Sequence, residues 1–150
     1  MSNTKYLSLD YGERRVGVAV SDESKKYSFS RDFLINDSGF MGNLLSLIKG
    51  ENIERVIIGY PLNLKSEKTD VTEKVENFKG ELEKILAKNS LEVKVEFYDE
   101  RFTSNLAREN MLSSGLKKSK RRDKGIIDSI SAQIILQDYL DRKQRFPDEE

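Results

Sequence analysis

The start of the sequence combines a carboxylate with residues that leave the backbone open to a ligand. Asp10 ends the apolar segment 6–9, Gly12 follows two residues later, and Gly17 lies in the β-branched segment beyond it. The pattern predicts strands at Tyr6–Asp10 and Arg15–Val20, joined by a tight turn. A carboxylate there can hold a metal ion or approach a phosphate, although strand-end aspartates also commonly cap turns through their side chains.

Two more acidic residues end a later predicted strand. Asp99 and Glu100 follow the alternating segment Leu91–Tyr98. Neighbouring residues on a strand point to opposite faces of the sheet, so at most one of the two can join Asp10. The other carboxylate is solvated or pairs with Arg101.

A fourth acidic residue, Asp128, lies within the last predicted helix, Lys124–Lys143. Ala132, Ile135 and Tyr139 follow it at helical spacing, which places Asp128 on a largely apolar stripe. A carboxylate in such a position is costly unless it is paired or bound to a metal. The alternative is an acidic residue in the first turn, favoured by the helix dipole. We favour the metal-binding interpretation.

The composition limits the chemistry available to these residues. The 150 residues include no cysteine and no histidine. Disulfides, thiolate nucleophiles, Ser-His-Asp triads and the usual zinc sites are therefore excluded. Carboxylates are hard oxygen ligands, so we expect a site for Mg²⁺ or Mn²⁺.

Basic residues are concentrated next to the last helix. Lysine and arginine balance aspartate and glutamate at 26 each, but segment 117–124 holds six basic residues and one acidic residue. Such runs are most often solvated surface. This run leads into the helix with Asp128, so it can also reach phosphates beside the carboxylates. The candidate phosphate contacts are Arg14, Arg15, Arg101, Lys118, Lys120, Arg121 and Arg122.

The order of the predicted elements indicates one α/β domain over residues 1–143, with a polar, frayed tail at 144–150. Between the segments above we predict a third strand, two helices and a buried strand. These are Tyr27–Ile35, a helix capped by Asp37 or Ser38 and ending near Gly50, Val56–Ile58 before Gly59-Tyr60-Pro61, and a helix containing Val71 to Ile85. A further helix, capped by Thr103 or Ser104, ends at Gly115. Helices then cover both faces of the sheet, and Asp10, Gly59 and Asp99 collect at the carboxyl ends of its strands.

No segment has the length of a bilayer span or the apolar core of a signal peptide. We therefore expect a cytoplasmic protein without membrane contact. We also expect a monomer or a weak homodimer.

Four motifs, in this order, resemble the YqgF family, also called RuvX, of Holliday junction resolvases. The first motif is met by Asp10, Tyr11, Gly12, Arg15, Gly17, Ala19, Ser21 and Asp22, and the second by Gly59-Tyr60-Pro61-Leu62-Asn63. The third is met by Asp99-Glu100-Arg101-Phe102-Thr103-Ser104, and the closing helix by Lys124, Asp128, Ala132, Ile135, Leu136, Tyr139 and Leu140. The chain departs from the family in lacking a glycine after Asn63, where it reads 64–68 as Leu-Lys-Ser-Glu-Lys, and in having Ser131 where alanine is common.

The resemblance implies a ribonuclease H-like fold, with a five-stranded mixed sheet in the order 3-2-1-4-5. It implies a nuclease that hydrolyses phosphodiester bonds of structured nucleic acid with two Mg²⁺ or Mn²⁺ ions. Asp10 would bridge the ions, and Glu100 and Asp128 would each hold one. Glu100 is preferred to Asp99 partly on this resemblance. The implied role is 5′-end processing of precursor 16S rRNA, with cleavage of branched DNA as the alternative. The residues themselves suit RNA and DNA equally.

Two other classes of protein share parts of the pattern. ATPases and sugar kinases use a similar opening hairpin, but they close two such domains around a nucleotide and need a second glycine-rich loop. A non-catalytic nucleic-acid-binding module would need the basic segment but not three carboxylates. Replacement of Asp10 separates the module from the nuclease, because it would abolish activity only in the nuclease.

Overall fold

A computed structural model describes residues 3–61, 68–99 and 124–145 of the chain, with the main chain alone at 124–128. The strands are β1 (Lys5–Asp10), β2 (Arg15–Ser21), β3 (Ser28–Ile35), β4 (Ile53–Tyr60) and β5 (Lys94–Asp99). The helices are α1 (Phe40–Gly50), α2 (Asp70–Lys88) and α5 (Lys124–Arg145).

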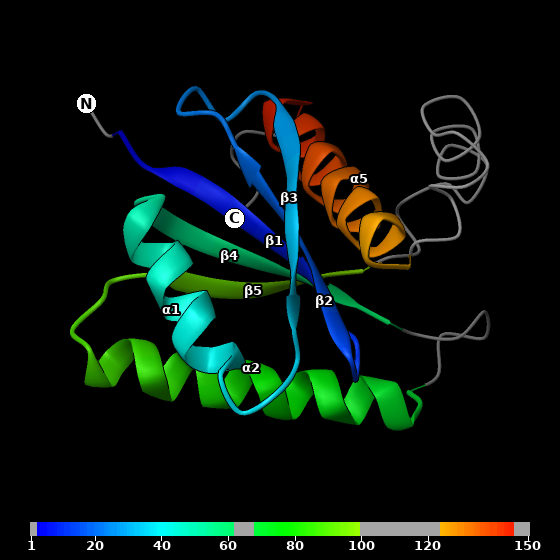
Figure 1. Cartoon of the computed structure of the whole chain (residues 1–150). Helices are drawn as coiled ribbons and strands as arrows, with labels where there is room; N and C mark the ends of the chain where they lie inside the picture. The colour runs from blue at the N-terminus through cyan, green and yellow to red at the C-terminus, as the bar shows by residue number, and fades with distance from the viewer. Residues whose placement is uncertain (1–2, 62–67, 100–123, 146–150) are drawn as a thin grey trace.

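The strands form one mixed sheet in the order β3-β2-β1-β4-β5, which confirms the predicted topology. The first three strands pair antiparallel, as a meander. β4 then pairs parallel to β1, and β5 parallel to β4. The carboxyl ends of β1, β4 and β5 therefore meet at one edge of the sheet (Figure 1).

Helices cover both faces of this sheet, as predicted. Of the described helices, α1 and α2 lie on one face and α5 lies on the other (Figure 1). Each face has its own core because successive strand residues point to opposite sides. Leu7, Leu9 and the valines of β2 pack beneath α1 and α2, whereas Ala19 and Ile57 pack beneath α5.

The edges of several elements differ from the predicted ones. β5 begins at Lys94 rather than at Leu91, since segment 91–93 is not paired, and β4 extends over the whole of Ile53–Tyr60. Neither Asp37 nor Ser38 is the N-cap of α1. Gly39 takes that position, and the Asp37 carboxylate instead accepts a 2.9 Å hydrogen bond from the Gly39 N–H, just ahead of the helix.

α5 ends at Arg145, two residues beyond the predicted end. The predicted helix between Thr103 and Gly115 lies outside the described residues. In the described part of the chain no helix is long and apolar enough to cross a membrane.

Candidate active site at the carboxyl ends of the strands

Asp10 lies at the edge where the parallel strands end. Leu9 is in register with Ile58 of β4, so the next residue, Asp10, is level with Gly59. Gly59 is in turn paired with Tyr98 of β5. Asp10, Gly59 and Tyr98 therefore form one row across three strands, at the edge where open α/β sheets bind their ligands.

The side chain of Asp10 belongs to the face covered by α5. Its neighbours Leu9 and Tyr11 lie on the opposite face, where Leu9 is part of the core and the Tyr11 ring stacks on Phe78 of α2 at 4.5 Å. Strand alternation then directs Asp10 toward the α5 side. Asp10 is partly buried.

Asp99 lies on the other face of the sheet. It is paired with Tyr60, and Tyr60 contacts α2 through a 3.1 Å hydrogen bond to Glu76. Paired residues on neighbouring strands share a face, so Asp99 is on the α2 side, away from Asp10. Glu100, the residue predicted for the site, lies outside the described residues.

The turn after Asp10 depends on the small size of Gly12. A Cβ added to Gly12 would lie 2.5 Å from the main-chain carbonyl oxygen of Arg15. Asn36, just after β3, holds the turn from outside: its side-chain amide donates to the Gly12 carbonyl at 2.7 Å, and its N–H donates to the Arg14 carbonyl at 2.8 Å. The hairpin that carries Asp10 is therefore a closely packed turn with little freedom.

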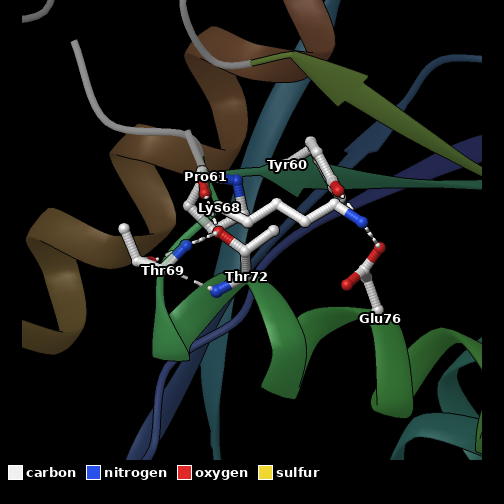
Figure 2. Close-up of polar contacts among 6 residues, drawn as sticks. All are labelled: Tyr60, Pro61, Lys68, Thr69, Thr72 and Glu76. Atoms are coloured by element: carbon white, nitrogen blue, oxygen red, sulfur yellow. Dashed lines mark hydrogen bonds and ion pairs between the residues drawn. The ribbon is translucent and has the colours of Figure 1, made fainter. Parts of the chain in front are cut away.

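The loop after β4 is fixed to the start of α2 (Figure 2). The Thr72 hydroxyl donates a short hydrogen bond to the Pro61 carbonyl, and Thr69 and Thr72 form a reciprocal cap in which the Thr69 N–H donates to the Thr72 hydroxyl at 3.0 Å. Each bond satisfies a polar group at a helix start or loop that would otherwise need water. The loop is thus anchored on both sides of segment 62–67.

An ion pair reinforces this anchor. Tyr60 and Lys68 both donate to the Glu76 carboxylate, each at 3.1 Å (Figure 2). The hydrogen bond from Lys68 lowers the pKa of Glu76, with a smaller contribution from the Tyr60 hydroxyl, and the same hydrogen bond raises the pKa of Lys68. Glu76 therefore stays charged at neutral pH and holds the end of β4 and Lys68 against α2.

Hydrogen bonds hold α5 against the strands beside the site. The Ser8 hydroxyl, on the same face as Asp10, donates to the main-chain carbonyl of Ala132 at 2.6 Å. One turn nearer the start of the helix, the Ser129 hydroxyl accepts from the Val18 N–H at 3.5 Å. Asp128, whose main chain is described, comes immediately before Ser129 in the helix. The start of α5 therefore lies beside the carboxyl end of β1 (Figure 1).

The second half of α5 is fixed by buried tyrosines. The Tyr98 hydroxyl donates a short hydrogen bond to the Asp138 carboxylate, and Arg55 donates to the Tyr139 hydroxyl at 2.7 Å. Burial raises the pKa of both tyrosines, and the hydrogen bonds to Asp138 and to Glu96 raise those of Tyr98 and Tyr139 further. These hydroxyls therefore remain protonated donors at any physiological pH.

The structure describes two of the seven predicted phosphate contacts. Arg14 is exposed in the hairpin turn, and Arg15 is partly buried at the start of β2. The other five lie outside the described residues: Arg101, Lys118, Lys120, Arg121 and Arg122. Among the described side chains, those of residues 3–61, 68–99 and 129–145, no group of three or more acidic residues is placed to hold a metal ion. Asp10 is the predicted ligand whose side chain is described.

One groove of about 540 Å³ lies elsewhere. It is lined by the end of α2, by segment 91–94 and by Glu54 and Arg55 near the start of β4. These residues are at the amino ends of the strands, opposite the row that contains Asp10. The groove is therefore separate from the candidate site.

Sequence patterns missed the residues that join α5 to the sheet. Ser8 and Ser129 are both buried, yet Ser8 lies between the apolar residues Leu7 and Leu9, Ser129 lies one helical turn before Ala132, and neither belongs to a motif. The available signal was a serine in an otherwise apolar, buried strand, since a buried hydroxyl needs a partner. The identity of that partner required the fold.

Comparison with a family model gives a match over residues 4–142, to RuvX, described as Holliday junction resolvase. The chain belongs to this family. The match spans every described element of the sheet and most of α5.

Relatives of similar length match over nearly the whole chain. A protein of Bacteroides fragilis, named "Putative pre-16S rRNA nuclease", is 37% identical over 94% of this chain and 99% of its own length. A protein of Sulfurihydrogenibium with the same name is 38% identical over 93% of this chain and 91% of its own length.

Solved structures agree on the fold. RuvC of T. thermophilus, in complex with a Holliday junction substrate, matches with a TM-score of 0.64 at 14% identity, over 95% of this chain and 97% of RuvC. The Fowlpox virus resolvase, also in complex with Holliday junction DNA, matches with a TM-score of 0.56 at 12% identity, over 93% and 98% of the two chains. At these identities the likeness establishes the resolvase-type, ribonuclease H-like fold.

Proposed function

We propose that this protein is a divalent-metal-dependent nuclease that hydrolyses phosphodiester bonds in structured nucleic acid, in the 5′-end processing of precursor 16S rRNA. The observation that carries the proposal is the position of Asp10. Its carboxylate belongs to the α5 face at the carboxyl edge of the sheet, and the main chain of Asp128, in the second turn of α5, lies beside that edge. Two carboxylate-bearing elements thus converge where a ligand can reach them.

The donor set suits Mg²⁺ or Mn²⁺. Asp10 is partly buried at the end of a strand, and a chain without histidine or cysteine offers oxygen ligands to hard cations. We assign Asp10, Glu100 and Asp128 as the residues that hold the ions. The position of Asp99 supports Glu100, because Asp99 is on the α2 face, away from Asp10.

The bound ions would supply positive charge that stabilises the attacking and leaving oxygens at the phosphorus. The other groups of the chain position the substrate. Arg14 is exposed in the turn after Asp10, where it can contact a neighbouring phosphate. We assign Arg15, Arg101, Lys118, Lys120, Arg121 and Arg122 to the same task. Contacts of this kind orient the backbone and carry little sequence information.

Precursor rRNA is the substrate that the relatives favour. Two proteins that carry the pre-16S rRNA nuclease name are 37% and 38% identical to this chain over more than nine-tenths of its length. The family description and the solved structures name Holliday junctions instead, so DNA resolution is the second candidate.

The test compares two aspartate variants in one cleavage assay. Asp10→Asn should abolish Mg²⁺- or Mn²⁺-dependent cleavage, because it removes a charged ligand without changing the size of the side chain. Asp99→Asn is the matched control and should retain activity, since Asp99 is on the opposite face. The substrates are a 16S precursor with its 5′ extension and a four-way DNA junction, each with and without EDTA.

The outcomes separate the candidates. Cleavage of the precursor alone supports rRNA processing, and cleavage of the junction alone supports resolution. Undiminished cleavage in EDTA, or an active Asp10→Asn variant, would refute the nuclease mechanism. Binding of nucleic acid without cleavage by the wild type would indicate a non-catalytic binding module.

A further inference from the structure

We infer that Ser8 is a positioning residue of the proposed metal site: its hydroxyl ties the strand with Asp10 to the helix with Asp128 and fixes the register between them. The inference rests on the proposed function and adds a residue that no sequence motif marks. Ser8 lies two positions before Asp10 on the same face of β1.

The contact is buried and short. Ser8 is fully buried, and its hydroxyl donates to the Ala132 carbonyl at 2.6 Å, which joins residues 124 positions apart. Ala132 lies inside α5, so its carbonyl can also accept the ordinary helical hydrogen bond with its other lone pair. Loss of the Ser8 hydroxyl therefore leaves no main-chain carbonyl without a partner.

The direction of α5 carries the effect of this bond to the site. Ala132 is bonded to Ser8. Ser129, one turn nearer the start of α5, is bonded to Val18, and Val18 is paired with Leu9, the residue after Ser8. The helix and β1 thus run antiparallel. Four residues of helix cover about 6 Å, and two residues of strand about 6.6 Å. The main chains of Asp128 and Asp10 therefore lie at nearly the same distance from the Ser8–Ala132 hydrogen bond, and in the same direction.

Apolar packing alone would not fix this register. Ala19, Ile57 and Ala132 form much of the contact between α5 and the central strands, and contacts of this kind are not directional. A slide of one residue along a helix is about 1.5 Å, whereas functional constellations need their groups within about 0.5 Å. Directional hydrogen bonds supply the constraint, and the bond from Ser8 acts on the strand that carries Asp10 itself, whereas those of Tyr98 and Arg55 act farther along α5.

Ser28 on β3 provides a matched control. It is also buried, and its hydroxyl donates to the carbonyl of Gln133, the next helix residue, at 2.8 Å. Three other hydrogen bonds still join Ser28 and Lys26, just before β3, to α5 when the hydroxyl is lost. They run from the Ser28 N–H to Gln137 at 2.9 Å, from Gln137 to the Lys26 carbonyl at 2.9 Å, and from Gln133 to the Ser28 carbonyl at 3.3 Å.

The experiment measures metal affinity in Ser8→Ala, Ser28→Ala and the wild type. Mn²⁺ is titrated by calorimetry without substrate, and the Mg²⁺ dependence of cleavage is measured at saturating substrate. We expect Ser8→Ala to need about 3- to 10-fold more metal for half-saturation, the factor by which one ordinary hydrogen bond shifts an equilibrium. Ser28→Ala should match the wild type, and the KM for nucleic acid should be unchanged in both variants.

Urea denaturation shows whether the two variants lose similar stability, so that a difference in metal affinity reflects position. Unchanged metal affinity in Ser8→Ala, or equal weakening in both variants, would overturn the inference while an active wild type upholds the proposed function. A wild type that binds Mn²⁺ but cleaves nothing would refute the proposed function, and the calorimetric titration would still decide the role of Ser8. A wild type that binds no metal would overturn both.

Discussion

Replacing Gly12 with alanine tests whether the turn after Asp10 is as tightly packed as the structure indicates. The new Cβ would lie 2.5 Å from the Arg15 carbonyl oxygen, and real Cβ atoms essentially never approach within 3.0 Å. The carbonyl or the turn must therefore move by about half an ångström or more. Neither can move freely, because Asn36 bonds the Gly12 and Arg14 carbonyls and Arg15 begins β2.

The expected cost follows from the backbone nature of this contact. Overpacking of a well-packed region costs about 1–3 kcal/mol of unfolding free energy when neighbours must shift. Gly80→Ala is the matched control, since a Cβ at Gly80 in α2 has no neighbouring atom within 4 Å. A glycine-to-alanine change inside a helix stabilises by about 0.5–1 kcal/mol. The two substitutions should therefore change stability in opposite directions.

Urea denaturation followed by far-UV circular dichroism gives both free energies of unfolding, and a metal-dependent cleavage assay follows the site. Gly12→Ala should also lower activity, because the displaced turn begins two residues after Asp10, whereas Gly80→Ala should leave activity at the wild-type level. A Gly12→Ala variant as stable and active as the wild type would refute the argument that this close approach constrains the hairpin.

Three further predictions concern the anchors of the site and its substrate. Because burial raises the pKa of Tyr98 above its unfolded value of about 10, folding stability should fall as the pH rises above about 10, and Tyr98→Phe should weaken that dependence in denaturation curves at pH 8 to 11. Thr72→Val should lower the free energy of unfolding by about 1–2 kcal/mol, since it removes a cap and the bond to the loop after β4; an unchanged midpoint in urea would contradict this. Alanine at both Lys118 and Lys120 should reduce the slope of log affinity against log salt by about 2, equally for substrates of different sequence, with filter binding as the measurement.

Local patterns in the sequence predicted most elements of the sheet, and the family resemblance added the order of its strands. The apolar and β-branched segments joined by the Gly12 turn, the wholly apolar Val56–Ile58 segment and the amphipathic helix through Val75 and Phe78 each have a local physical cause, and the structure confirms them. Element boundaries were less predictable. The Asp37 carboxylate bonds the Gly39 N–H in a turn before α1, and this local alternative to a helix cap has the same sequence signature.

The sequence by itself determined the kind of chemistry open to this protein. The absence of cysteine and histidine leaves carboxylates, and their places after strands and within the last helix indicate an oxygen-ligand site. Tertiary structure decided which face each carboxylate takes. Strand alternation alone does not say which face of the sheet Asp10 or Asp99 takes. The contact of Tyr11 with Phe78 assigns Asp10 to the α5 face, and the contact of Tyr60 with Glu76 assigns Asp99 to the α2 face.

The register of α5 on the sheet was likewise beyond the sequence. Periodicity shows which residues of a helix face a sheet, but not where along the strands the helix sits, since apolar contacts are much alike from one position to the next. Hydrogen bonds between distant residues decide that position, and one of them joins Ser8, two residues before Asp10, to Ala132. Such a contact depends on two segments 124 residues apart reaching bonding distance, which only the folded chain achieves.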